Sequence, residues 1–158
     1  MGTDVYLIWD GMTEEEKDAQ SARFSIAAGR VGYLWASMFM LRENQILCEL
    51  FPSEYWISSE PLPYDFEANY EKVLSLGAKY ILTILYELSW PSENNKSMKA
   101  VKTRERPLND SSMSFINTRV AKKLDFRRAI SWLNSLFDFF DLGLRKQREG
   151  LNPKVEIL

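Results

Sequence analysis

The chain has no histidine and only one cysteine, Cys48, among its 158 residues. Histidine is the usual base of serine and cysteine hydrolases, the commonest zinc ligand and the side chain that titrates near neutral pH. One cysteine can form neither an internal disulfide nor a Cys-only zinc or iron–sulfur site within one chain. The common hydrolase, redox and zinc chemistries are therefore excluded. We expect Cys48 to be a small buried apolar residue in a reducing compartment.

Long apolar runs and phosphate-binding loops are also missing. The most apolar stretches, 31–41 and 73–90, fall short of an uncharged span of about 18 residues, so we expect no membrane-spanning segment. The N-terminus lacks the basic and apolar regions of a secretory signal, which makes the cytoplasm the expected location. Neither a Gly-x-x-x-x-Gly-Lys loop nor a Gly-x-Gly-x-x-Gly loop after a strand is present, and we expect no cofactor.

Carboxylates are the catalytic resource that remains, since acid–base or magnesium chemistry can run on Asp and Glu alone. The candidate catalytic residues are Asp10, Asp138 and Asp141. Simpler roles explain them, because Asp10 lies in a turn and Asp141 precedes Arg145 at the spacing of a helical surface pair. We therefore do not expect an enzyme, and a carboxylate- or metal-dependent enzyme is the first alternative.

Charge is distributed unevenly along the chain, although the net charge is only −2. Residues 1–95 contain 6 Lys and Arg against 15 Asp and Glu, whereas residues 96–128 contain 10 against 3. Such a basic segment can contact phosphates or an acidic protein surface. Sequence-independent nucleic-acid binders are usually basic overall, so we favour neutralisation of this segment by the acidic half of the same molecule. Weak nucleic-acid binding through 96–128 is the second alternative function.

The patterning predicts a predominantly helical α+β domain of four to five helices with a small sheet that pairs the N- and C-terminal strands. Residues 5–9 are rich in β-branched and aromatic side chains, and residues 155–158 alternate as a strand does. Two isolated strands need a ladder partner, so we expect them to pair with each other. An all-α bundle is the alternative. The length favours one domain over 1–158.

Helix signals come next along the chain. Thr13 is followed three residues later by Glu16, a capping box that predicts a helix start. Residues 31–51 repeat apolar side chains at helical spacing and predict one long amphipathic helix. Asp65 is expected to cap a further helix, in which Gly77 lies on the apolar stripe and requires the close approach of a neighbouring helix.

The last third of the chain contains the candidate binding residues. A polar stretch at about 91–109 is expected to be a mobile loop, where contacts with a partner are most readily made. A helical segment at 110–124 follows, and residues 126–144 carry an apolar face wider than one packing partner requires. That helix is either central in the fold or shared with a partner. The candidates from the loop and this helix are Lys99, Lys102, Arg104, Arg106, Trp132 and Phe139.

Aromatic side chains make up 13% of the residues, more large rings than a small core needs. Rings are favoured at protein interfaces as well as in cores. Together with the wide apolar face and the polarised charge, this surplus favours a protein-interaction or regulatory module. It would act as a homo-oligomer or as a neutralising partner of another protein.

Overall fold

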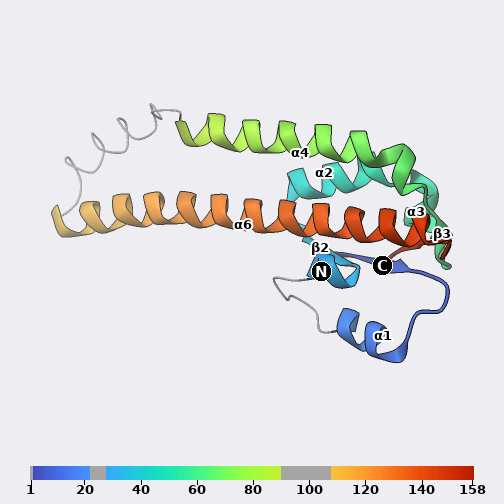
Figure 1. The fold of residues 1–158 in the computed structure, drawn as a ribbon. Coiled ribbons are helices and arrows are strands. Elements are labelled where there is room, and N and C mark those ends of the chain that lie inside the picture. Colours follow the sequence, from blue (N-terminus) through green and yellow to red (C-terminus); the bar gives the residue numbers. More distant parts are fainter. Residues whose placement is uncertain (1, 22–27, 90–107) are drawn as a thin grey trace. The chain divides into compact units, whose positions relative to one another are not determined.

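A computed structural model of the chain describes residues 2–21, 28–89 and 108–158, with the backbone alone for residues 89 and 108–125 (Figure 1). The described elements are, in order, β1 (Gly2–Ile8), α1 (Glu14–Ser21), the 3-10 helix η1 (Ala28–Val31), β2 (Tyr33–Ser37), α2 (Leu41–Leu50), α3 (Ser53–Ile57), β3 (Leu62–Pro63), α4 (Phe66–Ser89), α6 (Leu108–Arg148) and β4 (Lys154–Ile157). The predicted α+β class is confirmed, and the all-α alternative is wrong.

The strands form one antiparallel sheet in the order β2-β1-β4-β3. The first and last strands lie side by side, with Val5 opposite Ile157 and Leu7 opposite Val155. Backbone hydrogen bonds between Asp4 and Leu158 extend this ladder to the last residue. The predicted pairing of the chain ends is therefore confirmed.

The chain divides into two compact units. We call residues 1–79 and 131–158 the acidic unit, because they contain 17 Asp and Glu against 10 Lys and Arg, and residues 80–130 the basic unit, which contains 5 against 10. The single domain over 1–158 that the length favours stays a prediction. Positions 91–107 of the expected basic loop at 91–109 lie outside the described residues. The last two positions of that range belong to α6, which begins at Leu108.

Residues 31–51 do not form the single helix that their spacing predicted. Tyr33–Ser37 is strand β2, paired with β1, and helix α2 begins only at Leu41. The neighbouring residues Tyr33 and Leu34 point to opposite faces of strand β2, and both are buried, so both faces are apolar. An apolar run of this kind fits the spacing of a helix as well as that of a strand. The prediction for Cys48 was also wrong. Helix α2 buries Ile46, Leu47 and Leu50, which leaves Cys48 exposed.

The local helix signals were more reliable. The Thr13 N–H donates to Glu16 Oε2 over 2.8 Å, and the Glu16 N–H donates to Thr13 Oγ1 over 3.2 Å, so the capping box is confirmed. A Cβ on Gly77 would lie 2.5 Å from Phe137 Cζ and 3.2 Å from Leu133 Cδ1 of α6. The predicted close helix approach is confirmed as well. The segments predicted at 110–124 and 126–144 belong to one helix, α6.

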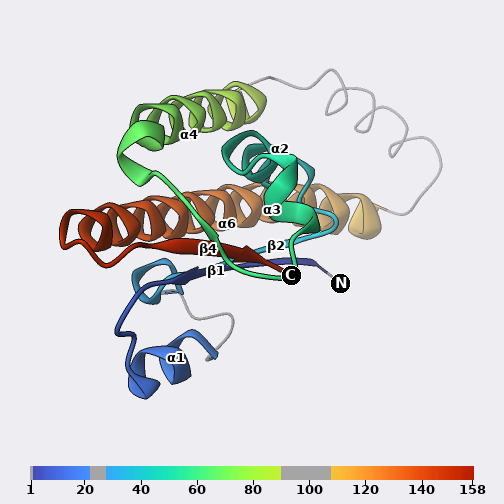
Figure 2. The same ribbon diagram turned by 90° about the vertical axis from the view of Figure 1, so that its right-hand side faces the viewer.

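The C-terminal part of α6 is the centre of the acidic unit. It crosses one face of the sheet, with α1 on the opposite side (Figure 2). Phe140 is fully buried, and its ring lies 6.2 Å from that of Phe51, 5.8 Å from that of Tyr64 and 5.3 Å from that of Phe66. Within this unit the wide apolar face of the helix is therefore occupied by the chain itself.

Candidate functional site

The three candidate carboxylates are used in three separate polar contacts. Asp10 Oδ2 accepts a hydrogen bond from Asn152 over 2.9 Å. Asp138 forms an ion pair with Arg30 over 3.2 Å, and Asp141 accepts a 3.0 Å hydrogen bond from the Tyr70 hydroxyl. This hydrogen bond and the charge of Asp141 raise the pKa of Tyr70. Within the described ranges, no three Asp, Glu or Cys side chains gather as a metal site would require.

The two apolar binding candidates lie inside the acidic unit. Phe139 is fully buried, and Trp132 is buried with its indole N–H donating to the Trp35 carbonyl over 2.9 Å. In β1, Asp4 lies opposite Trp35 of β2, but its backbone forms hydrogen bonds with Leu158 on the other side. The backbone N–H and C=O groups of Trp35 therefore point away from β1, towards the outer edge of β2. Trp132 thus covers an edge strand, a position that otherwise invites pairing with another chain. The basic candidates Lys99, Lys102, Arg104 and Arg106 lie outside the described residues.

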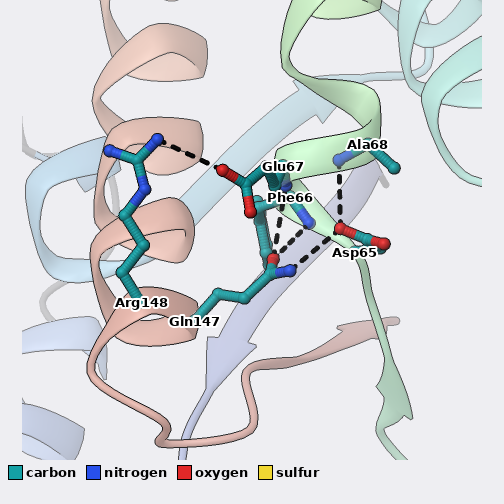
Figure 3. Close-up of polar contacts among 6 residues, drawn as sticks. All are labelled: Asp65, Phe66, Glu67, Ala68, Gln147 and Arg148. Carbon is teal, nitrogen blue, oxygen red and sulfur yellow. Dashed lines mark hydrogen bonds and ion pairs between the residues drawn. The ribbon is translucent and has the colours of Figure 1, made fainter.

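A polar cluster joins the start of α4 to the end of α6 (Figure 3). Gln147 Oε1 accepts hydrogen bonds from the N–H groups of Phe66 (2.7 Å) and Glu67 (3.3 Å), while its amide nitrogen donates to Asp65 Oδ1 over 2.9 Å. Asp65 caps the helix as predicted, because the same oxygen accepts the Ala68 N–H over 3.0 Å. The hydrogen bond from Gln147, followed by that from Ala68, holds the pKa of Asp65 below its usual range. The N–H groups at the start of α4 are therefore satisfied by Asp65 and by Gln147 of α6, and the cluster serves the fold.

Replacing Gln147 by alanine is expected to lower the free energy of unfolding by about 1 kcal/mol, because two N–H groups of α4 lose their acceptor.

The stability of the wild-type chain should also fall as pH drops below the usual carboxyl pKa of about 4, since the Asp65 pKa is lowered in the folded state. The variant should lose part of this acid dependence. Urea unfolding from pH 3 to pH 7 measures both effects. The exposed Gln45, changed to alanine, is the matched control, and an equal loss there would contradict this role.

Exposed large apolar side chains gather at the turn between β2 and α2. Met38, Phe39 and Leu41 are 53%, 84% and 75% exposed, and we call these three residues the apolar tip. Sequence reasoning missed the tip because it placed the turn inside a helix. A signal was present, since four consecutive large apolar side chains, at positions 38–41, come directly after a strand-like aromatic run.

The backbone behind the apolar tip is fixed by hydrogen bonds. The Met40 N–H donates to the Ser37 carbonyl over 2.9 Å, and the Phe39 N–H donates to Ser37 Oγ over 3.2 Å. The Asn44 amide donates to the carbonyls of both Ser37 and Met40, over 2.7 and 2.9 Å. The Thr3 hydroxyl of β1 donates to Asn44 Oδ1 over 3.1 Å and links the turn to the sheet. The tip is therefore presented on a well-ordered turn.

No protein-family model matches the chain, and no curated protein or solved structure is significantly similar to it. Among the helices that the structure describes, none is at once long enough and apolar enough to cross a bilayer.

Proposed function

We propose that the chain is a protein-interaction module that docks on its partner through the apolar tip. The observation that carries this proposal is the exposure of Phe39, between two other exposed apolar side chains. Burial of one such side chain contributes about 1.5–3 kcal/mol, so the three together match the anchor cluster at the centre of a typical interface.

The ordered turn strengthens the case for a docking role. Binding costs about 0.5–1.5 kcal/mol for each side chain that must be immobilised, and more where a loop must be ordered. Asn44 and Ser37 already hold the backbone of the tip through their hydrogen bonds. The tip therefore enters a pocket with little loss of backbone freedom, which favours affinity.

Charge indicates the chemistry of the partner. The acidic unit has seven more acidic than basic side chains. A basic rim around the apolar pocket of a partner would complement this unit at close range, whereas the anionic surface of a membrane would not. A protein partner is therefore favoured over a lipid surface. Cys48, which is exposed, suits a reducing location such as the cytoplasm.

Replacing Phe39 by glutamate is expected to abolish capture of the partner without changing the melting temperature, because the side chain projects into solvent. The experiment immobilises the wild-type chain and two variants and quantifies the proteins that each retains. Ile57, 85% exposed on α3, supplies the control, and its change to glutamate should leave capture intact. Proteins retained equally by all three chains would contradict docking through the tip.

Neither alternative function gains a supporting contact. The carboxylates do not converge, as described above, and the basic candidates at 99–106 lie outside the described residues. Weak nucleic-acid binding rests on sequence charge alone, namely ten Lys and Arg against three Asp and Glu in residues 96–128.

A further inference from the structure

The apolar tip contains an exposed methionine. Met38 is 53% exposed and comes directly after the last residue of strand β2. Peroxides convert the thioether of an accessible methionine into a polar sulfoxide, and reductases reverse the change. We propose that Met38 is a reversible oxidation site whose sulfoxide form releases the partner from the apolar tip. This inference rests on the proposed function, since it concerns the regulation of the same surface.

Met38 differs from the other methionines whose side chains the structure describes. Met12 and Met40 are half-buried. The sulfur of Met40 also accepts a hydrogen bond from the Ser37 N–H over 3.4 Å. Oxidation requires free approach of the peroxide to a lone pair of the sulfur, so burial and this hydrogen bond slow the reaction at Met40. Among these three methionines, Met38 is therefore expected to react first.

The oxidation transfers one oxygen atom from hydrogen peroxide to the sulfur of Met38. A sulfur lone pair attacks one peroxide oxygen, the S–O bond forms as the O–O bond breaks, and the other oxygen leaves as water with both protons. The sulfur loses two electrons, and the peroxide gains them. In the reverse reaction two thiols of a methionine sulfoxide reductase supply two electrons and two protons and become a disulfide, and the oxygen leaves as water.

The added oxygen changes the surface of the tip and leaves the fold intact. A sulfoxide is polar, and it loses hydrogen bonds to water when it enters an apolar pocket beside Phe39. Loss of one apolar anchor corresponds to a decrease in affinity of about tenfold or more. The hydrogen bonds of the turn come from Ser37, Met40 and Asn44, so oxidation of Met38 does not remove them. The oxidised chain should therefore keep its melting temperature.

Peptide mapping by mass spectrometry tests the selectivity of the oxidation without any partner. The chain carries Cys48→Ser, which removes its only thiol, and is treated with hydrogen peroxide. In the folded chain Met38 should be oxidised at least about threefold faster than Met12 and Met40, whereas in urea the three should react at similar rates. Equal rates in the folded chain would overturn the proposal.

Retention of proteins from a cell lysate tests the release. The probe is the protein that the Cys48→Ser chain retains and that is lost with Phe39→Glu, so that its binding depends on the tip. Peroxide treatment should lower its yield about tenfold, and a methionine sulfoxide reductase should restore it. Met38→Leu keeps an apolar side chain of similar size without the sulfur, so it should retain the protein after the same treatment. Met12→Leu is the matched control and should still lose it.

The outcomes separate this proposal from the docking proposal. A protein that depends on Phe39 but stays bound after oxidation of Met38 would refute the switch alone, as would equal losses from peroxide-treated wild type and Met38→Leu. If no retained protein depends on Phe39, docking through the tip fails, and the switch fails with it.

Discussion

Replacing Phe139 by alanine is expected to destabilise the acidic unit by about 3–5 kcal/mol, the usual cost of removing a buried ring. Phe139 is fully buried, and its ring lies 6.1 Å from that of Phe140 and 6.2 Å from that of Phe66. The surrounding helices cannot close the cavity completely, so the loss exceeds the transfer energy of the ring alone.

Phe39→Ala is the matched control for this experiment, since it removes the same ring from an exposed position. Its free energy of unfolding should change by no more than about 0.5 kcal/mol, as surface substitutions usually do. Urea unfolding followed by circular dichroism measures both variants. Similar losses for the two would mean that Phe139 is not the core residue described here.

Replacing Gly29 by alanine should be the most damaging of the small substitutions. A Cβ at this position would lie 2.0 Å from the carbonyl oxygen of Ser135 and 2.8 Å from its Cα. These are backbone atoms of α6 and cannot rotate away, so η1 and the helix must separate. Overpacking of this kind costs about 1–3 kcal/mol, and a backbone clash belongs at or above the upper end.

Gly11→Ala separates this clash from ordinary glycine effects. Gly11 has a φ of +76° with no atom near a Cβ, so alanine there suffers only backbone strain of about 1 kcal/mol. The melting temperature of Gly29→Ala should therefore fall further than that of Gly11→Ala. The reverse order would contradict the close contact between η1 and α6.

Local chemistry allowed several parts of this fold to be predicted. Thr13 and Glu16 mark a helix start because the capping box is satisfied by neighbouring residues, whatever the tertiary structure. Gly77 indicated a close helix approach because glycine inside a helix is costly without a packing reason. The pairing of β1 with β4 followed from the need of each strand for hydrogen-bond partners.

Longer-range packing decided the features that were missed. Strand β2 is buried on both faces, and periodicity alone does not separate such a strand from a helix. The error at residues 31–51 hid both the apolar tip and the exposed position of Cys48. The wide apolar face of α6 allowed two interpretations, and contacts such as those of Phe66 and Gly77 show that the chain itself covers it within the acidic unit.

Photo-crosslinking from Cys48 tests the docking proposal most directly. Cys48 is exposed, and it lies seven residues after Leu41 on α2, which places both on one side of the helix about 10 Å apart. A benzophenone attached to this single cysteine should cross-link one partner protein in the wild type and in Ile57→Glu. The yield should fall at least tenfold in Phe39→Glu. An unchanged yield in Phe39→Glu, or no product from the wild type, would contradict docking through the apolar tip.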